Sequence, residues 1–147
     1  MKEAKAAAQT LGLQLRLIEM RAPPEFEAGF NSVVQEKIRA LLILIDPLFI
    51  SNSRILAELS VKARLITMTG YKTFADAGAL MSYGPNYFDS YKAAAPYVDK
   101  ILRGANPADL PVDQSSRFEF VVNLKTAKIL GVEIPPSVLG FAGTVIE

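Results

Sequence analysis

Hydrophobic and polar residues follow two alternating periods along the chain, and these periods predict helices and strands in turn. Residues 2–11 are rich in Ala, Lys and Glu, which favour a helix, and Gly12 supplies a stop. Apolar and polar residues alternate over 13–17, which predicts a strand with one wetter face. Apolar residues within 26–38 then recur at the spacing of a helix with a single apolar stripe.

The segment 40–45 is apolar at every position, which is typical of a strand buried on both faces in a parallel sheet. Ser51 or Ser53 is expected to cap the helix that follows. Residues 65–69 have the pattern of another strand, which ends at Gly70.

The second half of the chain continues the alternation and contains its clearest amphipathic helix. The predicted elements are a short helix at 73–77, a short strand at 79–83, a helix at 87–102, an extended connection at 106–111, a strand at 118–123, a helix at 124–130 and an irregular tail from Pro135. Alternation of this kind predicts an α/β fold with a mostly parallel sheet, flanking helices and right-handed crossovers.

Composition narrows the possible functions. The chain has 147 residues, of which 16 are Lys or Arg and 15 are Asp or Glu, so it suits one globular domain and lacks the basic excess of a nucleic-acid binder. It contains no Cys and no His, which excludes thiolate nucleophiles, imidazole proton relays and the common zinc sites. We therefore predict no catalytic residue, no metal site and no cofactor.

Candidate binding residues follow the predicted strands, because ligands of parallel sheets sit beyond the carboxyl ends of the strands. The candidate ligand-binding residues are Asp46, Ser51, Tyr71, Lys72, Ser82, Tyr83 and Asn86. Each type also has a local use, since Asp and Ser are favoured in turns and at helix caps. Residues 70–73 resemble a phosphate-binding loop only superficially, because the upstream glycine and the Gly-Lys-Thr core are absent.

Four sequence blocks extend the interpretation beyond these patterns. They are LMSYGPN at 80–86, YVDKILRGANPADLPV at 97–112, FEFVVNLKTA at 118–127 and IPPS at 134–137. In order and spacing, from about Leu13 to Val138, the chain resembles the solute-binding proteins of ABC transporters, in particular those related to the tryptophan/tyrosine-binding group.

The resemblance implies a hinged, two-lobed periplasmic-binding-protein fold of the first type, with residues 1–147 forming only the carboxyl-terminal, Rossmann/flavodoxin-like lobe. It also implies a leader, an amino-terminal lobe and a first strand ahead of the first helix. By the same resemblance, helix 86–104 belongs against the other lobe or an oligomer contact. The implied ligand is a small organic solute such as an amino acid, and the implied partner is an ABC permease.

Without the amino-terminal lobe, an apolar stripe on the 87–102 helix would be exposed to solvent. We therefore expect a homodimer in which two chains pair through, or exchange, this helix. The residues expected at that contact are Tyr87, Phe88, Tyr91, Val98 and Ile101.

Two alternatives remain at this stage: a stand-alone flavodoxin-like interaction domain without a transport role, and an enzyme, which would need Lys72 buried beside an acid in a deep pocket. The resemblance implies a periplasmic or membrane-associated exterior location. The sequence shows no signal peptide and no apolar run of about 20 residues, so expression as written would place it in the cytoplasm.

Overall fold

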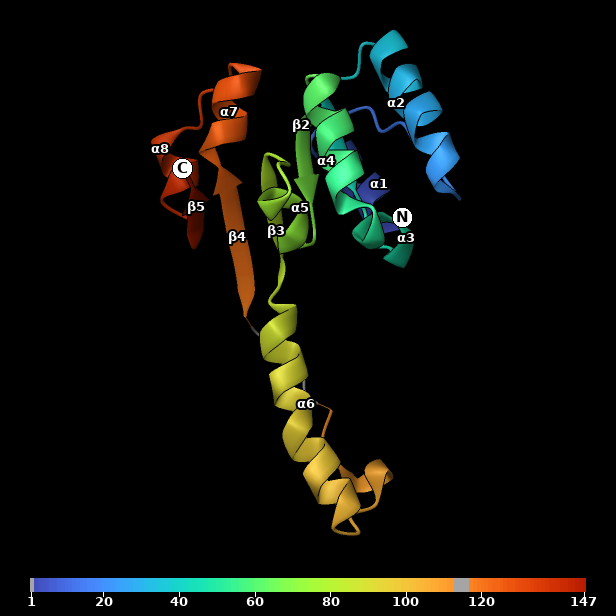
Figure 1. The fold of residues 1–147 in the computed structure, drawn as a ribbon, viewed down its shortest axis with the longest axis vertical. Coiled ribbons are helices and arrows are strands. Elements are labelled where there is room, and N and C mark those ends of the chain that lie inside the picture. The colour runs from blue at the N-terminus through green and yellow to red at the C-terminus, as the bar shows by residue number, and fades with distance from the viewer. Residues whose placement is uncertain (1, 113–116) are drawn as a thin grey trace.

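One five-stranded β-sheet, in the order β1-β2-β3-β4-β5, organises the residues that this computed structural model describes, 2–112 and 117–147 (Figure 1). The helices and strands are α1 Lys2–Thr10, η1 Pro23–Glu25, α2 Phe26–Gln35, β1 Ala40–Ile43, α3 Pro47–Ser51, α4 Ser53–Lys62, β2 Ile66–Thr69, α5 Lys72–Asp76, β3 Met81–Pro85, α6 Tyr87–Leu102, η2 Pro107–Asp109, β4 Phe118–Asn123, α7 Leu124–Leu130, α8 Pro136–Leu139 and β5 Thr144–Ile146. Three strand pairings are parallel and β3–β4 is antiparallel, which confirms the predicted α/β class with a mostly parallel sheet.

The main core lies between β1 and the helices α2, α4 and α5. Phe26 and Phe30 stand one helical turn apart on α2, so their rings project from the same face and pack against the sheet. Leu56 of α4 and Phe74 of α5 are almost completely buried in the same cluster. Burial of this apolar face is the main reason that these amphipathic segments fold as predicted.

A second apolar cluster joins β4 to α7, and Asn123 connects the two clusters. The Asn123 side-chain carbonyl accepts a hydrogen bond from the Thr126 amide at 3.0 Å and so caps α7. Its amide group donates to the carbonyl of Ala75 in α5 at 3.0 Å. The Thr126 hydroxyl donates to the carbonyl of Gly78 at 2.8 Å, so α7 is tied to the turn that follows α5.

The helix α6 is a long excursion from the sheet between two neighbouring strands. The pairing of Pro85 with Phe118 places the departure and the return side by side, and the Asn86 amide donates to the carbonyl of Arg117 at 3.3 Å. In Figure 1, α6 points away from the rest of the molecule. The Tyr97 hydroxyl donates to the carbonyl of Pro111 at 3.0 Å, which holds the returning chain against α6.

The prediction of a strand at 13–17 is wrong. These residues are extended but form no ladder with any described residue, and the side chains of Leu13, Leu15 and Leu17 are exposed. A period of two places apolar groups on one side of the chain, but a strand also needs a neighbour to complete its hydrogen bonds.

The prediction that 40–45 is buried on both faces is also wrong. β1 ends at Ile43, which is buried, whereas Leu42, Leu44 and Ile45 are exposed. β1 pairs with β2 along one edge, and its other edge pairs with no strand in the described ranges. The apolar run 40–45 therefore has a neighbouring strand on one edge only, and several of its side chains remain exposed to solvent.

Smaller differences concern helix starts and the tail. Neither Ser51 nor Ser53 caps α4, because α3 runs directly into it and Asn52 occupies the junction. The extended connection contains the short turn η2. The tail is regular, since it contains α8 and β5, and β5 extends the sheet by pairing with β4. Among the described residues, no helix is long and apolar enough to cross a membrane.

Candidate functional site

The parallel strands β1 and β2 end at the same level of the sheet, whereas β3 continues beyond that level to Pro85, and several predicted binding residues lie near this edge. We call this edge the rim and define it by Asp46, Tyr71, Ser82, Tyr83 and Asn86. The register of Thr69 opposite Ser82 places the end of β2 beside the middle of β3. Ser82 and Tyr83 lie within β3 rather than after it, because the strand predicted at 79–83 runs from Met81 to Pro85. The role of these residues in binding stays a prediction.

Glycine allows the strand ends to approach each other closely. A Cβ atom added to Gly84 would collide with the carbonyl oxygen of Gly70 and lie 2.8 Å from its carbonyl carbon. A Cβ atom added to Gly70 would lie 2.7 Å from the terminal side-chain carbon of Ile45. The backbone that follows β2 therefore packs directly against β3 at Gly84, and the side chain of Ile45 lies against Gly70.

Aromatic rings gather on the same edge. The rings of Tyr71 and Tyr87 lie with their centroids 4.5 Å apart, at an interplanar angle of 38°. Tyr83 stacks on Phe118 at 5.5 Å and meets Phe120 edge-on at 6.3 Å. Such rings offer flat apolar faces next to hydroxyl groups, a combination that suits small aromatic or amphipathic ligands.

Ser82 is the most unusual polar residue of the rim. Its side chain is 1% exposed, and its hydroxyl has no hydrogen-bond partner among the described residues. The neighbouring Thr69 hydroxyl, in contrast, donates to the Tyr71 carbonyl at 3.0 Å and accepts from the Tyr71 amide at 3.2 Å. A buried hydroxyl without a partner costs about 1–3 kcal/mol, so Ser82 has an unused hydrogen-bonding capacity.

Four of the predicted residues have local structural roles. Asp46 accepts a hydrogen bond from the Leu48 amide at 2.8 Å and caps α3, and Asn86 accepts one from the Asp89 amide at 3.2 Å and caps α6. Ser51 is the last residue of α3. The ammonium group of Lys72 pairs with Asp76 at 2.9 Å on the surface. This exposed pair is not the deep, buried lysine that an enzyme interpretation required.

Sequence reasoning assigned Tyr87 to a dimer contact only, although its ring contacts Tyr71 at the rim. Its position directly after the Gly-Pro-Asn turn was the available signal. Gly70 and Gly84 were also missed as packing residues, because their proximity depends on strand register. In the described residues, no cluster of three or more carboxylates could hold a metal ion.

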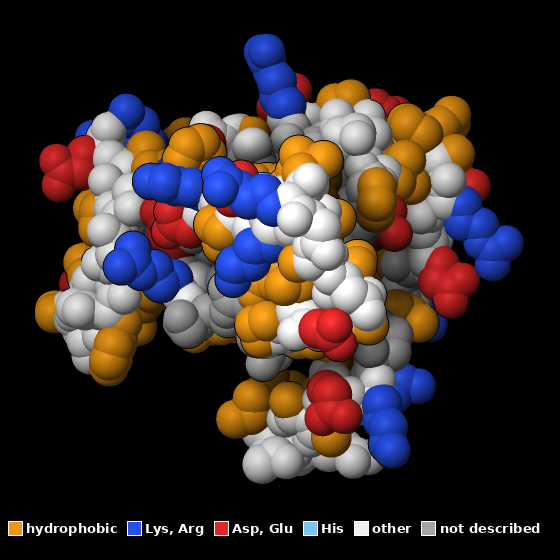
Figure 2. All heavy atoms as spheres, turned by 90° about the horizontal axis from the view of Figure 1, so that it is seen from below, with side chains coloured by type: hydrophobic (Ala, Val, Ile, Leu, Met, Phe, Trp, Pro, Cys, Tyr) orange, Lys and Arg blue, Asp and Glu red, His pale blue; other side chains and the backbone are white. Residues whose placement is uncertain are grey.

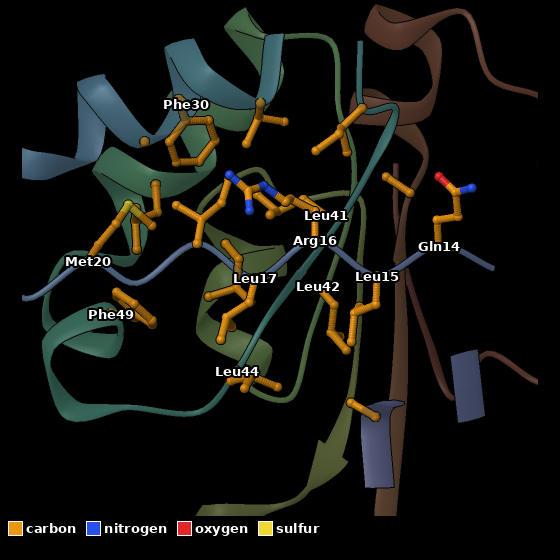
Figure 3. Close-up of a pocket in the computed structure, with 18 residues that line it drawn as sticks. Gln14, Leu15, Arg16, Leu17, Met20, Phe30, Leu41, Leu42, Leu44 and Phe49 are labelled. Carbon is orange, nitrogen blue, oxygen red and sulfur yellow. The ribbon is translucent and has the colours of Figure 1, made fainter. Parts of the chain in front are cut away.

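One hollow in the structure was not anticipated from the sequence. It lies between the extended segment 14–18 and β1 with the residues that follow it, and it has a volume of about 210 Å³ (Figure 3). Its walls are mainly apolar and include Leu15, Leu17, Leu42 and Leu44. It is separate from the rim residues defined above.

The sequence and the fold both resemble those of known proteins. The sequence model of the family described as ABC transporter substrate binding protein matches residues 1–146. A comparison with curated proteins finds no match.

Several solved structures resemble the chain. The ABC domain from Streptococcus pneumonia in complex with L-Trp is 28% identical, with a TM-score of 0.89 over 99% of this chain and 49% of that one. A substrate-binding protein with adhesive properties from Clostridium difficile, in its ligand-free, open structure, is 25% identical, with a TM-score of 0.68 over 99% of this chain and 48% of that one.

A conserved domain protein from Vibrio cholerae is 24% identical with a TM-score of 0.89, over 98% of this chain and 48% of that one, and supports the fold alone. The chain thus spans about half the length of the solved structures that it matches. Because the family match covers nearly every residue, from 1 to 146, the chain belongs to the ABC transporter substrate binding protein family.

Proposed function

We propose that this chain is one lobe of an importer's solute-binding protein and that its rim holds a small organic solute such as an amino acid. The observation that carries the proposal is the ring pair formed by Tyr71, which follows the end of β2, and Tyr87, the first residue of α6. The L-Trp complex of the similar Streptococcus pneumonia structure supports an amino-acid ligand. The proposed activity is binding rather than catalysis.

The rim offers partners for the ammonium group and the ring of an aromatic amino acid. Ile45 and Gly70 are in close contact, so the next residues along, Asp46 and Tyr71, lie on adjacent chain segments. Asp46 uses one carboxylate oxygen to cap α3, and its other oxygen can pair with the solute's ammonium group. The ring of Tyr71 can stack on the solute.

The half-length match supports a second lobe as the other wall of the site. In this proposal α6 packs against that lobe, the two lobes close over the solute, and an ABC permease receives it on the outer side of the membrane. One lobe alone buries only one side of the solute. We therefore expect weak binding to residues 1–147, with a dissociation constant of about 1 mM or weaker.

The test is a titration of isotopically labelled protein with L-tryptophan, followed by amide NMR, which detects weak binding. We expect shifts at Gly70, Tyr71, Ser82 and Gly84. Tyr71→Ala should weaken binding about fivefold, because a ring contact of this kind contributes roughly 1 kcal/mol. Tyr91→Ala is the matched control, since Tyr91 lies on α6 and is exposed. The proposal fails if neither L-tryptophan nor a panel of other amino acids moves the rim amides at about 10 mM.

A second candidate function, an interaction domain that dimerises through α6, is favoured by the surface of that helix. None of the described residues of α6 is buried, and Phe88 and Tyr91 are 78% and 77% exposed. Val98 and Ile101 continue the same stripe toward the far end of α6. Figure 2 views the molecule from the α6 end and shows hydrophobic side chains exposed among Lys and Arg side chains.

This candidate predicts a dimer that depends on the α6 stripe. Light scattering should give a dimer mass at high protein concentration, and Phe88→Glu should convert it to monomers, because a buried carboxylate without a partner is strongly unfavourable. Phe141→Glu is the control, since Phe141 is exposed and lies outside α6. A monomer at every concentration would exclude pairing through α6.

A further inference from the structure

The end of the molecule opposite the rim carries a group of exposed cationic side chains. Helices α2, α4 and α7 all end there, at the end of the molecule that lies away from α6 (Figure 1). β1 and β2 begin at the same end, with Ala40 opposite Ile66. We call this group the far-end patch, and its members are Lys37, Arg39, Lys62, Arg64 and Lys128.

Backbone contacts bring the five residues together. The Ile66 amide donates to the Arg39 carbonyl at 2.9 Å, so the chain segments that lead into β1 and β2 run side by side. The guanidinium of Arg64 donates to the carbonyl of Leu130 at 3.1 Å, which brings the last turn of α7, with Lys128, to the same place. The cations therefore lie on three adjacent segments of chain.

Little negative charge faces these cations. No ion pair with another described residue involves any member of the far-end patch. Among the acidic residues nearby in the sequence, Glu36 already pairs with Arg16 at 3.1 Å, and Glu133 follows α7. The patch therefore carries an excess of positive charge, although the formal net charge of the whole chain is only +1.

Helix ends explain only part of this charge. The carbonyl groups at the end of a helix favour a cation nearby, which accounts for one cation at each of α2, α4 and α7. Lys37 and Arg64, however, have φ angles of 56° and 54°, a left-handed conformation that glycine adopts with less strain. The same pair of backbone hydrogen bonds closes other helix ends, and there the matching residue is glycine: Gly12, Gly78, Gly104 and Gly131. Cations thus replace glycine at two strained positions of the patch, which favours a use for their charge beyond folding.

A hollow between α2 and α4 adjoins the far-end patch. It has a volume of about 210 Å³, and its lining includes Lys62, the last residue of α4, and Glu27, in the first turn of α2. Between them lie the buried ring of Phe30 and the partly buried side chain of Leu59. Val34 also lines the hollow and is 51% exposed. The hollow therefore has an apolar floor that is open to an incoming side chain.

We infer that the far-end patch and this hollow together form a docking surface for an acidic segment of a partner protein, which places an apolar side chain in the hollow and carboxylates against the cations. Charge complementarity selects an acidic partner. A protein segment suits the surface better than a membrane does, because membrane binding uses apolar side chains that protrude, whereas a hollow receives one. The surface lies away from the rim and α6, so a second lobe packed on α6 would leave it free.

The test is amide NMR on labelled residues 1–147 with three synthetic peptides of about 12 residues, long enough to reach from the hollow across the patch. The first is a Gly/Ser peptide with a central Leu followed by a run of Glu. The second has Gln in place of Glu, and the third has Ser in place of Leu. We expect the first peptide to shift the amides of 34–39 and 59–65 and to bind at least about tenfold more weakly when salt is raised from about 0.02 M to about 0.5 M. The other two peptides should bind more weakly than the first.

Variants separate docking from folding. Lys37→Gly removes one charge and also relieves the left-handed backbone, so the midpoint of thermal unfolding should stay the same or rise while the first peptide binds about threefold more weakly. Lys62→Gln should weaken binding by a similar factor. Lys100→Gln is the matched control, because Lys100 is an exposed cation on α6 at the other end of the molecule.

Several outcomes would overturn the inference. One is that the first peptide shifts no amide of 34–39 or 59–65, and another is that Lys37→Gly and Lys62→Gln both bind it as tightly as the parent chain. Equal binding of the Gln peptide would mean that the cations have no part, and equal binding of the Ser peptide that the hollow has none. Vesicles that contain phosphatidylglycerol are the last arm: if they shift these amides and the peptide does not, a membrane is the occupant. None of these results depends on the L-tryptophan titration, because the rim lies at the opposite end.

Discussion

Replacing Gly84 with alanine lowers the free energy of unfolding by at least about 3 kcal/mol, because the new methyl group meets backbone rather than a movable side chain. The Cβ atom would collide with the carbonyl oxygen of Gly70, next to the Thr69–Ser82 pairing. Relief requires β2 and β3 to move apart at the centre of the sheet. The same movement would separate Tyr71 from Ser82 and disturb the rim.

Chemical denaturation followed by circular dichroism measures this effect, and thermal unfolding should show a fall of roughly 10 °C. Gly143→Ala is the matched control, because its new Cβ atom would meet nothing closer than the Phe120 carbonyl oxygen at 3.8 Å. A Gly84→Ala protein as stable as the Gly143→Ala protein would show that β2 and β3 are not packed as closely as described.

Phe74→Ala should have the second large effect, a loss of about 3–5 kcal/mol, because it removes a ring from the closed main core. Phe74 is 1% exposed and packs in the cluster that contains Phe26 and Leu56. Its amide also donates to the carbonyl of Tyr71 at 3.1 Å, so the turn that carries Tyr71 is held to α5. A cavity under α5 should therefore reduce solute binding as well as stability.

The same substitution at Phe141 provides the control. Phe141 is 82% exposed, so Phe141→Ala should change the free energy of unfolding by less than about 0.5 kcal/mol. Urea titrations of the two variants at the same pH measure the difference directly. Equal stabilities would mean that Phe74 is not part of a closed core.

These two predictions concern the same feature of the molecule. The rim lies where β1 and β2 end beside β3, and its aromatic and hydroxyl groups are placed by backbone contacts beneath them. The proposed solute site therefore depends on the sheet as much as on the side chains that would touch the ligand. Gly84→Ala should therefore lower both stability and solute binding, whereas Tyr71→Ala should lower mainly solute binding.

The sequence by itself determined the order and kind of most elements. The bounds of α6, β4 and α7 agree with the patterns at 87–102, 118–123 and 124–130. These signals are local, since apolar spacing and turn residues act within one or two turns of chain. The same reasoning predicted a binding edge, because residues that follow parallel strands lie at one edge of a sheet, although Ser82 and Tyr83 are inside β3.

Only the tertiary structure decided which apolar segments are covered. Residues 13–17 have the pattern of a strand with one polar face, and 40–45 the pattern of a strand buried on both faces. In the structure, however, Leu15, Leu17, Leu42 and Leu44 are exposed and line the hollow beside β1. Tertiary structure also decided the contact between Gly70 and Gly84, the meeting of Tyr71 with Tyr87, and the fifth strand in the tail. The physical reason is that burial and strand pairing belong to pairs of segments, and a pattern within one segment does not specify its neighbour.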